Sequence, residues 1–147
     1  MFYEQHINEQ FEVLLFKISF YLYWLGCYTS LISIEIPSSL KTIDRLVFAG
    51  CTSLTSVEIP NGVTKIGEGA FSGCISLSSI DIPSSVTSIE EGAFSGCTGI
   101  KKFVVDKDNP NYCSLDGALY TKDMKILIRV PGDIDSFLFH NSVIRVY

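Results

Sequence analysis

The feature that most constrains this chain is a stretch of 23 residues that occurs twice in succession. Residues 50–72 read GCTSLTSVEIPNGVTKIGEGAFS and residues 73–95 read GCISLSSIDIPSSVTSIEEGAFS, with 15 of the 23 positions identical. A period of roughly 20 to 30 residues is typical of solenoids, in which one short supersecondary unit stacks on the next. The repeat therefore predicts a mainly β solenoid built from 23-residue coils.

The same period extends beyond these two copies. Proline recurs at positions 37, 60 and 83, and cysteine at positions 51, 74 and 97. Cys27 lies 24 residues before Cys51, so we expect one extra residue between Cys27 and Leu31. Apolar residues recur in the same register: Leu31, Leu54, Leu77 and Ile100; Ile34, Val57, Ile80 and Phe103; Ile36, Ile59, Ile82 and Val105.

Each part of the repeat has a predicted conformation. Alternation along residues 56–59 turns Val57 toward the core and Ser56 and Glu58 toward solvent, as in a strand. Pro60 ends that strand because proline lacks the backbone donor that a ladder needs. Residues 63–66 are expected to form a second short extended segment. Residues 67–73 are expected to form a turn that places Phe71 in the core.

The repeat pattern divides the chain into three regions. Residues 1–25 are predicted to be an irregular N-terminal cap that merges into a degenerate half-repeat, with Trp24 in the aromatic position. Residues 26–105 are predicted to form three to four coils of the solenoid. Residues 106–147 are predicted to form a β-meander, with turns at Asp116-Gly117 and residues 121–125, followed by an incomplete terminal repeat.

Charge and hydropathy exclude several classes of function. The formal net charge is −5, and no basic cluster is longer than Lys101-Lys102, so nucleic acid and anionic membrane surfaces are disfavoured as partners. The apolar run at residues 13–25 is shorter than the roughly 20 residues that a membrane span needs, so no membrane span is expected. The acidic residues Glu4, Glu9 and Glu12 are unlike the basic start of an export signal, so none is visible.

The repeat carries a family likeness. Its consensus, Cys-x-Ser-Leu-x-Ser-(Val/Ile)-(Glu/Asp)-Ile-Pro-x-x-Val-Thr-x-Ile-x-x-x-Ala-Phe-Ser-Gly, resembles the BspA-type leucine-rich repeat over residues 26–105. Residues 103–131 resemble the hairpin insert found with such arrays. The resemblance implies a solenoid of a cell-surface or extracellular protein that adheres to protein ligands such as host matrix proteins. It brings no catalytic motif and no cofactor.

The outward positions of the first strand of each coil form the candidate contact surface. Stacking of the coils would align carboxylates and serines into two rows, and solenoids present such a repetitive face to partners. A solvated face, a cation site, a structural spacer that binds nothing and an intracellular scaffold remain alternatives. The candidate protein-contact residues are Ser33, Glu35, Ser56, Glu58, Ser79, Asp81 and Lys102.

Other reactive residues are predicted to be structural. Cysteines in equivalent positions point in parallel, which suits a buried row of free thiols and neither a disulfide nor a metal site. Cys113 lies in the predicted meander, where a side chain can be exposed, so it is the one thiol to test for reactivity. His6 and His140 are the only histidines and lie outside the regular repeat, so no enzyme, metal or cofactor is expected. The apolar tail from Phe137 predicts self-association.

Overall fold

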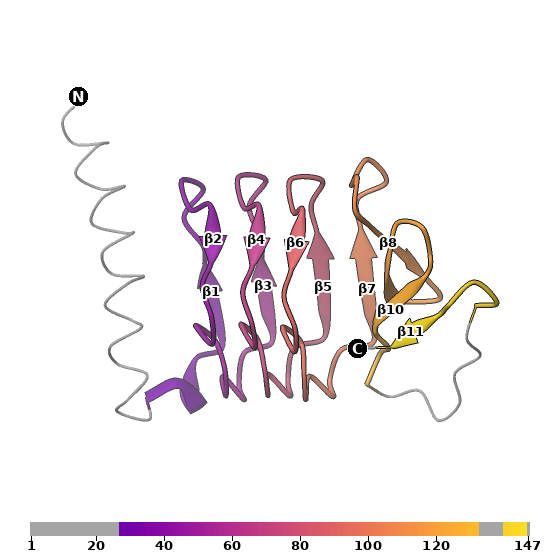
Figure 1. Cartoon of the computed structure of the whole chain (residues 1–147). Helices are drawn as coiled ribbons and strands as arrows, with labels where there is room; N and C mark the ends of the chain where they lie inside the picture. Colours follow the sequence, from indigo (N-terminus) through magenta and orange to yellow (C-terminus); the bar gives the residue numbers. More distant parts are fainter. Residues whose placement is uncertain (1–26, 133–139, 147) are drawn as a thin grey trace.

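The computed structural model describes residues 27–132 and 140–146, and these are almost entirely β-structure and turns (Figure 1). The predictions for the N-terminal cap, including Trp24, and for Phe137 lie outside the described residues. A 3-10 helix, η2 (Cys27–Ser30), stands where the sequence predicts one extra residue. The strands are β1 (Ser33–Glu35), β2 (Thr42–Ile43), β3 (Ser56–Glu58), β4 (Lys65–Ile66), β5 (Ser79–Ile82), β6 (Ser88–Ile89), β7 (Lys102–Val105), β8 (Tyr112–Leu115), β9 (Ala118–Thr121), β10 (Ile126–Arg129) and β11 (Arg145–Val146).

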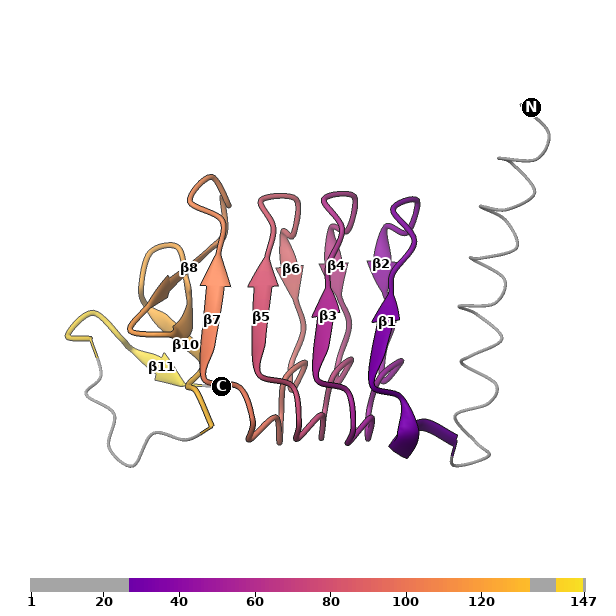
Figure 2. The ribbon, with the colours of Figure 1, turned by 180° about the vertical axis from the view of Figure 1, so that it is seen from behind.

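Stacked coils give two columns of parallel strands (Figures 1 and 2). In the first column β1 pairs with β3 and β5 with β7, and each residue lies opposite the residue 23 positions later, as Glu35 lies opposite Glu58. Pairing is interrupted between β3 and β5, where Ser78 N donates to Thr55 O at 3.3 Å. The second column, β2-β4-β6, is continuous. The 23-residue solenoid predicted from the repeat is confirmed.

The Ala-Phe turns form a third column. The ring of Phe71 stacks between Phe48 and Phe94, with ring centroids 5.1 and 5.6 Å apart. Phe71 is fully buried, as predicted from its position in the repeat. The repeating leucine, isoleucine and valine positions fill the space between the three columns, and their burial holds the coils together.

The C-terminal part confirms the predicted meander. β8 and β9 form an antiparallel hairpin around Asp116-Gly117, and β10 returns antiparallel to β9. β11 then pairs with β10 in parallel. A small second core of Ala118, Tyr120 and Leu127 lies within this sheet, while Ile128 packs against the core of the array.

The insert also closes the strand side of the last regular coil. The buried side chain of Asn109 donates to the carbonyls of Pro83 and Val86 at 2.8 and 2.9 Å. Its oxygen accepts the amides of Asn111 and Tyr112 at 2.9 and 2.8 Å, which fixes the orientation of the amide group. One side chain thus replaces backbone partners that another coil would supply.

Two further contacts complete this closure. The hydroxyl of Tyr112 accepts the amide of Ile89 in β6 at 2.7 Å. The carbonyl of Gly117 accepts the amide of Phe103 in β7 at 2.8 Å. Side chains and turns of the insert therefore occupy the ladder positions beside both strand columns.

Candidate protein-contact face

The predicted contact residues lie on one surface of the first strand column. Ser33 lies opposite Ser56 and Glu35 opposite Glu58 across β1 and β3. Ser79 lies opposite Lys102 across β5 and β7, and Asp81 lies opposite Val104. All seven are exposed except Ser79, which is half-buried. The surface formed by Ser33, Glu35, Ser56, Glu58, Ser79, Asp81 and Lys102 is called the strand face below.

The strand face is hollowed rather than flat. A shallow depression of about 810 Å³ runs across β1, β3, β5 and the end of β7. Its lining includes Asn61 and Asp106, which the sequence prediction did not include. Both were detectable: Asp106 continues the alternation of β7 two positions past Val104, and Asn61 follows the strand-ending Pro60.

The carboxylates of the strand face have no ion-pair partners within residues 27–132 and 140–146. Two glutamates elsewhere on the array have such partners: Glu68 pairs with Arg45 at 3.2 Å, and Glu90 pairs with Lys65 at 2.7 Å. The hydrogen bond from Lys65 lowers the pKa of the Glu90 carboxyl. The three carboxylates of the strand face, Glu35, Glu58 and Asp81, therefore form a row of negative charge that no direct ion pair neutralises, a pattern that attracts basic groups.

The cysteines of the array form the buried row that the sequence predicts. Cys51, Cys74 and Cys97 are free thiols in equivalent positions. The Sγ of Cys74 donates to Phe48 O at 3.1 Å, and the Sγ of Cys97 donates to Phe71 O at 2.9 Å. Burial raises the pKa of the Cys51 thiol to about 11, and the Cys97 hydrogen bond together with burial raises that of Cys74. Thiolate chemistry is thereby disfavoured at Cys51 and Cys74.

Cys113 is less accessible than its sequence position suggests. Its side chain is half-buried between strands, with Sγ 3.4 Å from Thr121 O and 3.2 Å from the Sδ of Met124. Burial raises the pKa of this thiol as well. Among the four cysteines whose surroundings are described it is the least buried, but it is half-buried rather than the exposed thiol that its place in the meander suggested, and it is not set up as a reactive thiol.

A histidine–serine pair near the C-terminus was not anticipated. His140 Nδ1 lies 2.7 Å from Ser142 Oγ, and that hydroxyl donates to Met124 O at 2.9 Å. The serine proton therefore faces a carbonyl rather than the imidazole, which does not match the arrangement of an activated nucleophile. Within the described residues, no group of three or more histidine, cysteine, aspartate or glutamate side chains could hold a metal ion. No helix in this part of the chain has the length and hydropathy of a membrane span.

Comparison with known proteins identifies the repeat. The model of the BspA-type leucine-rich repeat region matches residues 17–142 in six copies. This exceeds the three to four coils predicted for residues 26–105, because the match also includes residues 17–25 and 106–142.

Solved structures with the same fold come from bacterial proteins. A leucine-rich cell surface protein of Faecalibacterium prausnitzii aligns with a TM-score of 0.68 and 34% identity over 76% of this chain. A leucine-rich repeat protein of T. pallidum aligns with a TM-score of 0.52 and 27% identity over 80% of this chain. The pneumococcal vaccine antigen PcpA aligns with a TM-score of 0.56 and 22% identity over 78% of this chain, which shows the fold alone.

This chain spans 30%, 46% and 41% of those three proteins, respectively. Among curated proteins, none matches it. The family model covers most of the sequence, and the repeat positions that it describes are the ones that build the observed core. The chain belongs to the BspA-type leucine-rich repeat family.

Proposed function

We propose that the chain is a non-catalytic recognition module of a cell-surface protein and that its strand face contacts a protein ligand in adhesion. The observation that best supports this proposal is the row of Glu35, Glu58 and Asp81. These carboxylates are exposed, regularly spaced and without ion pairs in the described part of the chain. A partner with basic groups at a similar spacing would meet several carboxylates at once.

The chemistry of the family supports a binding role. BspA-type repeats are generally non-enzymatic, and the F. prausnitzii relative is described as a cell surface protein. The shallow depression across the strand face offers apolar and polar atoms together, as protein interfaces do. Matrix proteins of a host are the ligand class that we propose.

The test is charge reversal with a matched control. The variant Glu35→Lys/Glu58→Lys/Asp81→Lys and the control Asp44→Lys/Asp108→Lys/Asp123→Lys raise the net charge equally, since all six residues are exposed acids. Binding to immobilised collagen and laminin, with albumin as a blank, is measured by biolayer interferometry at two salt concentrations. We expect the first variant alone to weaken binding about tenfold or more, mainly through slower association.

Two outcomes would contradict the proposal. Equal loss in both variants would mean that net charge, rather than the strand face, controls binding. No binding of the unmodified chain to either matrix protein would favour a structural spacer within a longer array.

A second contact is proposed at the C-terminal sheet. β11 lies at the end of its sheet, and Ile144 just before it and Val146 within it are 80% and 56% exposed. An exposed strand edge with apolar side chains is a template for pairing with a second copy. We expect concentration-dependent self-association by light scattering, which Ile144→Lys/Val146→Lys should suppress. A monomer at all concentrations would contradict this part.

A further inference from the structure

The turn column has a hydrogen-bonding pattern that runs from coil to coil. The amides of Leu46, Phe48 and Gly50 donate at 2.7–3.0 Å to carbonyls of the second coil (residues 50–72), and the acceptors are Glu68, Ala70 and Ser72. The equivalent amides one coil later are those of Gly69, Phe71 and Gly73. They donate at 2.7–3.1 Å to carbonyls of the third coil (residues 73–95), and these acceptors are Glu91, Ala93 and Ser95. In both cases the acceptors are three alternate residues of the Ala-Phe turn. Each turn therefore offers three alternate donors to its neighbour.

The third coil offers the same donors without a recipient. The equivalent amides belong to Gly92, Phe94 and Gly96, and they have no hydrogen-bond partner in the part of the chain that is described. Gly69 is buried in the second coil, whereas Gly92, at the same position of the repeat, is exposed. The insert covers the strand columns of the array but leaves this turn uncovered.

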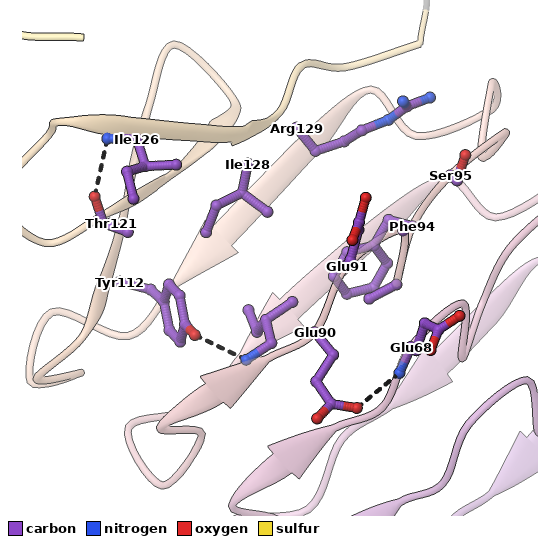
Figure 3. Close-up of a pocket in the computed structure, with 13 residues that line it drawn as sticks. Glu68, Glu90, Glu91, Phe94, Ser95, Tyr112, Thr121, Ile126, Ile128 and Arg129 are labelled. Carbon is purple, nitrogen blue, oxygen red and sulfur yellow. Dashed lines mark hydrogen bonds between the residues drawn. The ribbon is translucent and has the colours of Figure 1, made fainter. Parts of the chain in front are cut away.

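A cleft of about 680 Å³ lies against the uncovered turn (Figure 3). The turn forms one wall, and side chains from the insert and β10 form the other. We call it the terminal-coil cleft. Its lining combines apolar side chains with charged ones. Its lining is Glu68, Ile89, Glu90, Glu91, Gly92, Ala93, Phe94, Ser95, Tyr112, Thr121, Ile126, Ile128 and Arg129.

Two charges in the terminal-coil cleft have no ion pair within the described residues. Glu68 and Glu90 are neutralised by Arg45 and Lys65, while Arg129 and Glu91 have no such partner. The Nε of Arg129 is buried and makes no hydrogen bond. A buried donor without an acceptor is costly, so an acceptor from outside would be favoured there.

We propose that the terminal-coil cleft binds an extended segment of a partner protein that carries an acidic side chain. Alternate carbonyls of the segment accept from Gly92, Phe94 and Gly96, in the register that the turn column uses between its own coils. The acidic side chain accepts from Arg129. This is strand addition to an open edge, with one charged contact that selects the sequence. The site is separate from the strand face.

The test uses two end-capped peptides that differ in one atom group: Ac-Ser-Ala-Asp-Ala-Ser-NH2 and the same peptide with asparagine in place of aspartate. Each is titrated to millimolar concentration into the full ¹⁵N-labelled chain, and amide shifts and hydrogen exchange are followed. We expect downfield shifts and slower exchange at Gly92, Phe94 and Gly96. The asparagine peptide should bind about tenfold more weakly, as expected for loss of a charge-assisted hydrogen bond.

Variants assign the charged contact. Arg129→Gln should weaken binding of the aspartate peptide about tenfold and leave binding of the asparagine peptide unchanged. Arg129→Lys should restore part of the lost affinity. Glu91→Gln, on the same cleft, should strengthen binding of the aspartate peptide by removing a like charge. Unchanged amide spectra away from the cleft show that each variant is folded.

Three results would overturn the proposal. The first is no shift at Gly92, Phe94 and Gly96 with either peptide. The second is equal affinity for both peptides, which would remove Arg129 from the recognition. The third is peptide-induced shifts confined to the strand face, which would assign the binding to that surface instead.

Discussion

The second and third coils have nearly the same sequence but different surroundings. The turn at residues 67–73 has a backbone neighbour on both sides, with Phe71 between Phe48 and Phe94. The turn at residues 90–96 has such a neighbour on one side and the terminal-coil cleft on the other. Both turns keep the same conformation, since Gly69 and Gly92 have φ of 59° and 64°. The repeat therefore determines the shape of a coil, while its neighbours determine its exposure.

The two coils also differ in how their strands are satisfied. In the second coil, β4 is paired by backbone on both sides. In the third coil, β6 is paired by β4 on one side, while on the other side Tyr112 accepts from Ile89 of β6 and Asn109 donates to Val86 just before the strand. Backbone pairing adds one bond for each residue in a regular series, whereas the side-chain closure depends on a few specific residues. The terminal coil should therefore be the more sensitive to single substitutions in the insert.

The largest effect is expected for Phe71→Ala. Phe71 is fully buried between two rings, so its removal leaves a cavity that neighbouring coils cannot close without losing their register. We expect a loss of about 3–5 kcal/mol in the free energy of unfolding, measured by denaturant titration. Phe94→Ala should cost less, because one ring stacks on Phe94 and the other meets it edge-on.

Ile75→Ala serves as the control for this prediction. Ile75 lies four residues after Phe71, at the start of the next repeat, and is 50% exposed. Its truncation should change stability by less than about 1 kcal/mol. Similar values for Phe71→Ala and Ile75→Ala would show that the aromatic column does not hold the coils together.

The contrast between the two coils also shows which features can be predicted from the sequence. The period of 23, with proline and Ala-Phe in fixed places, predicts the strand columns, the buried Phe71 and the free thiols. Each of these depends on stacking identical units, so local pattern and global fold agree. The strand face follows for the same reason, because alternation within β3 turns Glu58 outward.

The contacts at the end of the array could not be predicted from the sequence, because they join residues that the 23-residue period does not relate. Nothing in the letters DKDNPN shows that Asn109 will bond to carbonyls of Pro83 and Val86. Arg129 enters the terminal-coil cleft only because the insert folds β10 back over the third coil. The donors at Gly92 and Phe94 are open only because the period stops there.

The second prediction concerns the side-chain closure of the third coil. Asn109→Ala removes two donated and two accepted hydrogen bonds and leaves the Val86 carbonyl without its donor. We expect a loss of about 3 kcal/mol in the free energy of unfolding. Hydrogen exchange should quicken in β6 and the insert and stay unchanged in β2. Asn61→Ala, at an exposed asparagine, is the matched control and should be near neutral. Uniform acceleration across the array would contradict a local role for Asn109.

The third prediction uses the thiols of the array interior. Burial raises the pKa of Cys51 from its ordinary value of 9.0 to about 11, so the unfolded chain loses this proton first as pH rises. The stabilisation is complete below pH 9 and is lost between about pH 9 and 11, by about 3 kcal/mol at most. Denaturant titrations across this range should show a steeper decline for the unmodified chain than for Cys51→Ala. Parallel declines would contradict the burial of a protonated Cys51.

The smallest effect compares the two equivalent glycines directly. Both Gly69→Ala and Gly92→Ala place a side chain at positive φ, which costs about 1 kcal/mol in each case. At Gly69 the new Cβ would lie 2.6 Å from Leu46 Cδ2, whereas at Gly92 the nearest atom is Ser95 Cβ at 3.8 Å. Gly69→Ala should therefore destabilise the chain by about 1 kcal/mol more than Gly92→Ala, the cost of a modest steric adjustment. Equal values in thermal unfolding would mean that the second turn is no more tightly enclosed than the third. That result would also weaken the case for an open cleft beside Gly92, because the two turns would then have equivalent surroundings.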